Sequence, residues 1–196
     1  MRQAKQAFGF LMSLMILGQP LFAASYTIDR DHTTVSFRVR HIVTPVQGFF
    51  REFEGTFEYD PKVPGTWKTE VTAQASSIDT NVEERDKHLK SADFFDAEQF
   101  PGLTFKSTEV TDVTSTGAKL HGLLTIHGVE KLVVFDLEIL GEVKDPWGNE
   151  IASFTATTKI NRKDFGLNWN KALETGQLLV GDEVTLTLDI AGIRQA

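Results

Sequence analysis

Residues 76–105, SSIDTNVEERDKHLKSADFFDAEQFPGLTF, place a short charged segment between two stretches in which apolar and polar residues alternate. We expect a helix over about residues 81–91, capped by Thr80 or Asn81, with Glu83 or Glu84 completing a capping box. The helix contains few apolar residues, so a position deep in a core does not suit it. It is better placed across the open end of a β-structure.

The rest of the chain alternates with the period of two that is typical of strands with one buried face. Residues 33–40 and 47–60 show this pattern, and in the second stretch Arg51 interrupts the apolar series and Gly55 predicts a bend or bulge. Residues 131–143 carry apolar side chains on both faces, which predicts burial on both sides. Further strands are predicted at 67–76, 103–110, 119–126, 150–160 and 183–191.

About eight strands joined mostly by short turns predict an all-β fold, either an antiparallel up-and-down barrel or a sandwich. Periodicity alone does not distinguish the two. A barrel of this size can be filled by side chains or can hold one slender ligand.

Residues 1–23 have the features of a secretory signal peptide, with Arg2 and Lys5 before an apolar run over residues 8–17. Cleavage after Ala23 and cleavage after Ala24 suit the sequence equally. The apolar run is shorter than the ~20 residues of a membrane-spanning helix, so we expect an exported protein without a permanent membrane anchor. The mature chain, residues 24–196, suits a single domain.

Composition narrows the classes of function. The chain has no cysteine, which removes disulfides, thiolate nucleophiles and zinc–thiolate sites. Its formal net charge of −7 argues against nonspecific nucleic-acid binding and against adhesion to anionic lipid surfaces. With 41% hydrophobic residues, among them 15 phenylalanines, the chain can fill an apolar core.

No motif points to catalysis. The sequence lacks a Gly-x-Ser-x-Gly elbow, and its acidic residues alternate with aromatic ones as on a solvated strand face. His121 and His127 are separated by an even spacing, but Gly128 favours a turn at His127. Neither His-x-His nor His-Glu-x-x-His is present. We therefore expect no enzyme activity, no metal site and no cofactor.

Two features each have two interpretations. The cluster from Arg85 to His88 is either a solvated helix face with weak ion pairs or a polar gate that meets a ligand head group. The regularly spaced phenylalanines either fill a core or line an open tunnel. In a tunnel, a prenyl chain would gain ~25 cal/mol for each Å² of apolar surface that it buries.

The chain resembles the YceI-like polyisoprenoid-binding family over residues 26–191. The resemblance is carried by separated motifs in one order, which include Asp31-His32-Thr33, Gly48-Phe49-Phe50, Ser77-Ile78-Asp79-Thr80, Arg85-Asp86-Lys87-His88-Leu89, Gly122-Leu123-Leu124-Thr125-Ile126-His127-Gly128-Val129 and Val180-Gly181-Asp182-Glu183-Val184. Glu130, where threonine is common, and Thr33, where serine is common, are mild departures. The resemblance implies an eight-stranded lipocalin-like barrel in the periplasm that holds a polyisoprenoid or isoprenoid quinone, without catalytic residues, and it makes a homodimer plausible.

Strand alternation supplies the candidate site. We expect the cavity to be lined by apolar side chains that share the inward face: Phe37, Val39, Phe49, Phe53, Phe57, Val133, Phe135, Leu137 and Phe154. Arg51, Arg85 and His88 are expected at a polar mouth. A carrier of an isoprenoid lipid is the favoured function, and the alternative is a stress-response or quinone-linked partner that docks to a membrane electron-transfer protein such as a cytochrome.

Overall fold

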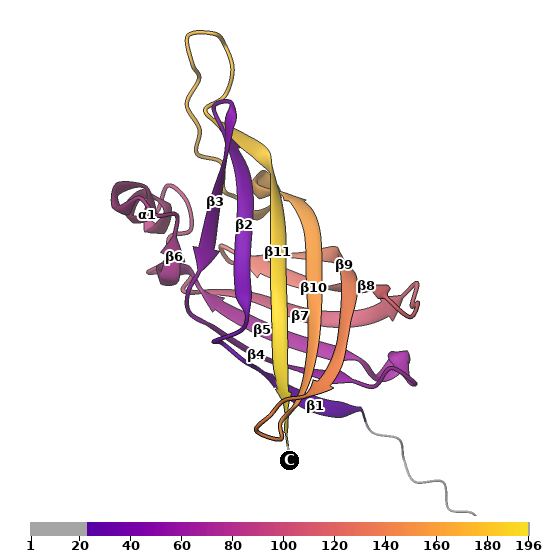
Figure 1. Cartoon of the computed structure of the whole chain (residues 1–196). Coiled ribbons are helices and arrows are strands. Elements are labelled where there is room, and N and C mark those ends of the chain that lie inside the picture. Colours follow the sequence, from indigo (N-terminus) through magenta and orange to yellow (C-terminus); the bar gives the residue numbers. More distant parts are fainter. Residues whose placement is uncertain (1–22, 196) are drawn as a thin grey trace, which may run out of the picture.

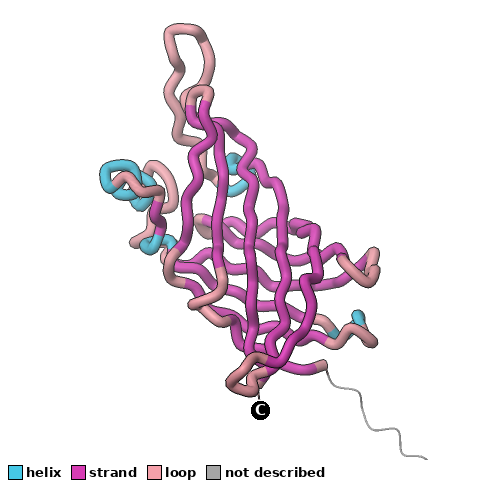
Figure 2. The backbone as a smooth tube through the Cα atoms, in the orientation of Figure 1, coloured by secondary structure: helices cyan, strands magenta, loops and turns pink. Residues whose placement is uncertain are grey.

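The structure is a computed structural model that describes residues 23–195, so residues 1–22 of the predicted signal peptide lie outside the described part. It is built almost entirely from strands (Figures 1 and 2). The elements are β1 (Ala24–Ile28), β2 (Thr34–His41), β3 (Thr44–Phe50), β4 (Phe53–Tyr59), η1 (Pro64–Thr66), β5 (Lys68–Gln74), η2 (Ala75–Ser77), β6 (Ile78–Asp79), α1 (Glu83–Lys90), β7 (Gly102–Thr111), β8 (Gly117–Ile126), β9 (Val129–Lys144), β10 (Glu150–Asn161), η3 (Arg162–Phe165) and β11 (Val180–Arg194).

The sheet closes on itself, which decides between barrel and sandwich. Strands β1, β4, β5, β7, β8, β9, β10 and β11 pair in that order, and β1 also pairs with β11. All pairings are antiparallel, so the ring is an eight-stranded antiparallel barrel, as predicted. In Figure 1, β9, β10 and β11 cross steeply in front of β4, β5 and β7. β2 pairs with the first part of β11 and carries β3 and β6 with it. This β2–β3 hairpin extends the wall beyond the ring.

Alternation places the core inside the barrel. β8 shows the pattern without interruption: Leu120, Leu124 and Ile126 are buried and their neighbours are half-buried. β9 follows it only on its inner face, because Leu132 and Val134 are exposed. The prediction that this strand is buried on both sides is therefore wrong; the ring leaves its outer face in solvent.

The irregularity predicted at Gly55 lies elsewhere. β4 pairs with β5 in unbroken register through Gly55 opposite Val71. A β-carbon at Gly55 would collide with the carbonyl oxygen of Glu70, so glycine is needed for close approach and not for a bend. The break falls at Arg51 and Glu52, between β3 and β4.

The predicted helix is present but begins differently. α1 starts after Val82, whose side chain makes no capping bond. Asn81 takes a left-handed φ of 61°, and Thr80 donates to Asp86 Oδ1 from its backbone N–H, at 2.8 Å. The predicted cap at Thr80 or Asn81 is therefore wrong. Thr80 does not cap the helix; it is held by the carboxylate of Asp86, which belongs to the helix. Within residues 23–195, no helix has the length and apolar character needed to span a bilayer.

Candidate functional site

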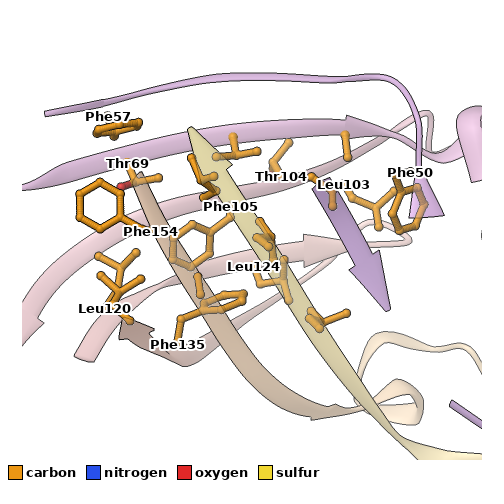
Figure 3. A pocket seen from close by; sticks show the side chains of 18 of the residues that line it. Phe50, Phe57, Thr69, Leu103, Thr104, Phe105, Leu120, Leu124, Phe135 and Phe154 are labelled. Atoms are coloured by element: carbon orange, nitrogen blue, oxygen red, sulfur yellow. The ribbon is translucent and has the colours of Figure 1, made fainter. Parts of the chain in front are cut away.

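An apolar cavity of about 120 Å³ lies inside the barrel. Side chains from strands on all sides of the ring point into the same space (Figure 3). The lining is dominated by aromatic rings and aliphatic groups, among them Phe50, Phe57, Phe105, Phe135, Phe154, Leu120, Leu124, Ala156 and Leu188. Such a lining holds an apolar molecule by removing it from water and by close packing.

Glycines on the wall keep this space open. In three places an inward ring lies where the β-carbon of a residue on a nearby strand would stand, so any larger residue there would collide with the ring. Each ring can then lie against the wall instead of projecting into the lumen. The pairs are Phe37 over Gly48, Phe57 over Gly192 and Phe105 over Gly122.

One end of the barrel is closed by aromatic packing. Tyr26 on β1 stacks on Phe57, with ring centroids 4.9 Å apart and planes 8° apart. Tyr59 on β4 lies against Trp67 at 4.7 Å and against Phe154 at 4.9 Å. These contacts join β1, β4 and β10, and four of the rings form part of the cavity wall: Phe57, Tyr59, Trp67 and Phe154.

A carboxylate lies beside the two tyrosines at this end. The Tyr26 hydroxyl donates to Glu142 Oε1 at 2.8 Å. Burial, and then the bond to Glu142, raises the pKa of Tyr26 well above its usual range. Burial and the charge of Glu142 also raise the pKa of Tyr59. Both hydroxyls therefore stay protonated in the folded protein at pH values where free tyrosine ionises.

We expect Tyr26→Phe to flatten the alkaline pH dependence of stability. Above a pH of about 10 the unfolded chain loses the tyrosine proton that the folded chain keeps, so the free energy of unfolding falls as pH rises. Removing the hydroxyl removes that contribution and costs about 1 kcal/mol at neutral pH through the lost hydrogen bond. Urea unfolding followed at several pH values between neutral and alkaline measures the slope. An unchanged slope in the variant contradicts the assignment.

The opposite end is covered by α1 and the segment after it. Phe95 meets Phe50 edge-on, with ring centroids 5.7 Å apart, and packs against the buried clusters in both halves of the barrel. Leu89 of α1 packs against the same core. The helix thus lies at the mouth of the barrel, as predicted from its sparse apolar content.

The predicted lining residues divide into groups. Phe57, Phe135, Leu137 and Phe154 line the cavity. Phe53 is buried, and Val133 is partly buried in the core beside the cavity without contributing to its wall. Phe37 and Val39 lie on the inner face of β2 where the hairpin leaves the ring.

Phe49 has to be corrected. Its neighbour Phe50 is the inward residue, and the Arg51 guanidinium lies over the outward Phe49 ring, 4.5 Å from the centroid. The break at Arg51 and Glu52 shifts the alternation by one residue, so Phe50 and Phe53 both point inward although they are three positions apart.

The predicted polar residues do not line the cavity, and each has a partner. Arg51 forms an ion pair with Asp79 at 2.8 Å. Arg85 donates from Nε to Thr80 Oγ1 at 2.7 Å. His88 Nε2 lies 2.9 Å from Asp93 Oδ2. These contacts hold the segment that carries α1 in place. Each of the three side chains is bound to a partner outside the cavity.

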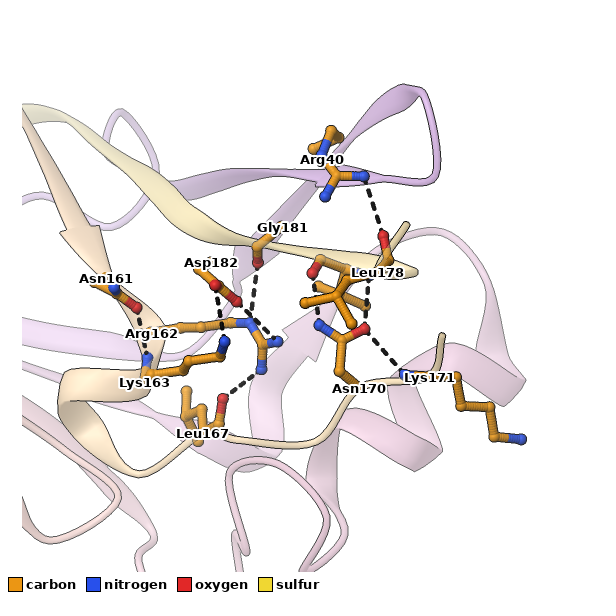
Figure 4. A network of polar contacts seen from close by, with 11 residues as sticks. Arg40, Asn161, Arg162, Lys163, Leu167, Asn170, Lys171, Leu178, Gly181 and Asp182 are labelled. Carbon is orange, nitrogen blue, oxygen red and sulfur yellow. Dashed lines mark hydrogen bonds and ion pairs between the residues drawn. The ribbon is translucent and has the colours of Figure 1, made fainter. Parts of the chain in front are cut away.

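A buried arginine that the sequence analysis did not identify anchors the long connection between β10 and β11 (Figure 4). Arg162 donates from Nε to the carbonyl oxygen of Gly181 at 3.0 Å and from Nη1 to that of Leu167. Its third partner is Asp182, at 3.5 Å, which also pairs with Lys163 at 2.8 Å. Burial lowers the pKa of Arg162, and Asp182 opposes that shift.

Several lining residues also escaped prediction. Leu120, Leu124 and Phe105 stand at regular alternating positions, so the same rule that selected Phe135 would have found them. Ala156 gives no such signal, because alanine is common on either face of a strand.

Comparison with known proteins agrees with this architecture. A YceI-like domain model matches residues 26–192. Protein YceI of Salmonella arizonae is 38% identical over 195 residues, covering 97% of this chain and 98% of its own length. Among solved structures, a Campylobacter jejuni YCEI protein is 30% identical with a TM-score of 0.70, covering 80% of this chain and 90% of its own.

A further solved structure has a similar fold at low sequence identity. A polyisoprenoid binding domain from Saccharophagus degradans superposes with a TM-score of 0.63 at 13% identity, over 88% of this chain and 99% of its own. The closed barrel, the match over nearly the whole described chain and the close relatives lead to one assignment: this protein belongs to the YceI-like family.

Proposed function

We propose that this protein is a periplasmic carrier that holds a polyisoprenoid or an isoprenoid quinone, with the prenyl chain in the barrel cavity. The observation that carries the proposal is the apolar lining of the cavity inside the barrel. The similarity to the polyisoprenoid binding domain from Saccharophagus degradans supports the class of ligand, and the predicted signal peptide supports export. Each buried carbon of such a chain contributes about 0.8 kcal/mol, so no covalent bond is needed to retain it.

The size of the cavity limits how much of the cargo it can hold. A cavity of about 150 Å³ in another protein accepts benzene. The 120 Å³ found here is therefore room for a short part of a prenyl chain. A longer chain requires inward rings that do not already lie over a glycine, such as Phe135 and Phe154, to move out of its path.

Native mass spectrometry of the mature protein purified from the periplasm tests the proposal. The expected result is one prenyl lipid bound per chain, which solvent extraction then identifies. A protein that is empty, and that also fails to take up added quinones or polyprenols, would overturn it. Recovery of the protein in a fraction other than the periplasm would overturn the assigned location.

Gly122→Ala should reduce cargo binding by displacing a ring. The added methyl group occupies the place of the Phe105 ring, which then has to project into the lumen. Overpacking of this kind costs about 1–3 kcal/mol of stability. The second variant, Gly122→Ala with Phe105→Leu, removes the collision with the ring but not the one with the carbonyl oxygen of Lys106, so it is expected to recover cargo and only part of the stability. Lipid per protein after extraction is the measurement; equal loss in the single and double variants contradicts the role of the ring.

A further inference from the structure

The hairpin between β2 and β3 ends in two apolar residues that project from the barrel. Ile42 and Val43 form its two-residue turn, since His41 and Thr44 are the last paired residues. Val43 is 80% exposed and Ile42 is 40% exposed. Figures 1 and 2 show this hairpin and the long connection before β11 extending together beyond the rest of the molecule.

The connection is fixed to the hairpin. The Ile42 N–H donates to the carbonyl oxygen of Leu179 at 2.7 Å, and Arg40 Nη1 donates to that of Leu178 at 3.2 Å. Leu178 is itself exposed. The two segments thus place three exposed apolar side chains close to the end of the hairpin, which we call the tip: Ile42, Val43 and Leu178. The connection continues beyond them through residues 173–177 (Figure 1).

Folding alone does not account for this turn. Ile42 has a φ of 57°, a left-handed conformation that is unfavourable for a β-branched residue. Two-residue hairpin turns favour asparagine and glycine at such positions. The chain instead has a strained isoleucine followed by an exposed valine, a choice that favours neither stability nor solubility. A departure of this kind points to a function at the tip.

The charge around the tip is opposite in sign to that of the whole chain. Residues 33–50 contain Arg38 and Arg40 and no acidic residue. The connection over residues 166–181 adds Lys171 and Glu174. The two acidic residues that follow, Asp182 and Glu183, are paired with Lys163 and Lys159, so the tip region has a positive balance although the chain carries −7. The overall charge disfavours adhesion to anionic lipid, but attraction at a membrane surface acts within about 10 Å and follows the local charge.

A second exposed apolar group provides the contrast. The hairpin between β9 and β10 exposes Val143 and Trp147. Its residues 138–150 include four acidic residues and one lysine. An anionic surface would repel that hairpin and attract the tip, so the charge pattern selects one end of the molecule.

The tip is continuous with the interior of the barrel. Val39, Phe37 and Val35 follow one another along the inner face of β2, opposite Val184, Leu186 and Leu188 of β11. Val35, Leu186 and Leu188 line the cavity. An apolar track therefore runs from the projecting hairpin into the lumen.

We propose that the tip inserts into the surface of an anionic lipid bilayer, with Arg38, Arg40 and Lys171 facing the lipid head groups. The apolar side chains enter the boundary between head groups and acyl chains, and the cations add electrostatic attraction. The inner face of β2 then leads from the bilayer to the cavity. Binding to lipid is a property of the tip itself and holds whether or not the cavity carries a prenyl lipid.

The test is flotation of the purified mature protein with vesicles of phosphatidylethanolamine and phosphatidylglycerol, compared with vesicles of phosphatidylcholine alone. The double variant Ile42→Gly, Val43→Ser is expected to lower the partition coefficient at least about tenfold, from the loss of two buried aliphatic groups. Its melting temperature should be unchanged or higher, because glycine relieves the backbone at position 42. Reduced binding therefore cannot be attributed to unfolding.

Two further variants complete the design. Val143→Ser removes a similarly exposed valine, at 65% exposure, from the acidic hairpin and should leave partitioning unchanged. Arg38→Gln with Lys171→Gln should lower binding to the anionic vesicles about fivefold per cation and weaken its dependence on salt. The proposal is overturned if the tip variant binds like the unmodified protein, if Val143→Ser loses as much, or if binding requires membrane proteins in the vesicles.

Lipid content measured by extraction separates this proposal from the carrier function. Tip variants that keep their bound lipid but no longer float with vesicles support the membrane contact. An empty protein that still floats in a tip-dependent manner would overturn the carrier and leave the membrane contact standing.

Discussion

Ala156→Phe is expected to empty the protein of its cargo while leaving the barrel folded. Ala156 lines the cavity from β10, and its paired residues Leu137 and Leu188 also line it. A phenyl ring at this position would fill most of the 120 Å³ of free space. Displacing one isoprene unit costs roughly 4 kcal/mol at about 0.8 kcal/mol per buried carbon. That corresponds to about a thousandfold loss of affinity.

The matched control is Thr157→Phe. Thr157 is the next residue on the same strand and faces away from the cavity, so this variant is expected to keep the cargo. Extraction and lipid quantification of the three proteins, with thermal unfolding followed by circular dichroism, decide the outcome. Because the new ring fills existing space, the melting temperature should change by no more than about 4 °C, equivalent to roughly 1 kcal/mol. Full lipid content in Ala156→Phe would mean that the cargo lies outside this cavity.

The sequence was sufficient to predict most of the strands because each strand repeats one local rule. Period-two alternation depends only on neighbouring residues, and Leu120, Leu124 and Phe135 obey it. Ring closure is not local. It depends on β1 reaching β11, whose paired residues Tyr26 and Arg194 lie at opposite ends of the described chain, and here the family resemblance supplied what periodicity could not.

The errors occurred where a residue's environment is set by distant parts of the chain. Arg51 interrupts the apolar series, but the irregularity was assigned to Gly55, so Phe49 was placed inside instead of Phe50. A register error of one residue reverses every face assignment on that side of the break. Leu132 was treated as buried because it is apolar, whereas the ring has no second layer over β9.

The polar mouth was predicted from residue type, and type does not reveal partners. Arg85 and His88 are chemically suited to a head group, but in the fold they bind Thr80 and Asp93. Arg162 was overlooked for the converse reason. It follows a strand beside Lys163 and looks like a surface cation, yet backbone carbonyls from two other places on the chain surround it.

Arg162→Met is expected to destabilise the protein by about 3 kcal/mol, which lowers the melting temperature by roughly 6–12 °C. The Arg162 side chain is 4% exposed, and methionine keeps its apolar stem but removes all its donors. The carbonyl oxygens of Leu167 and Gly181 then lose a charged partner inside the protein, and Asp182 loses one of its two cations. A buried polar group left without a partner costs more than the bond itself contributed.

Lys163→Met is the control, because Lys163 pairs with the same Asp182 from a side chain that is 39% exposed. Exposed pairs contribute little, so its loss should cost no more than about 1 kcal/mol. Hydrogen exchange should also locate the effect: Arg162→Met is expected to speed exchange between Leu167 and Gly181, and Lys163→Met is not. If the two variants are equally destabilised, the ion pair with Asp182 holds the connection and the backbone carbonyls do not. The larger effect in Arg162→Met would mean that one buried guanidinium fixes the connection whose far end, at Leu178, forms part of the projecting tip.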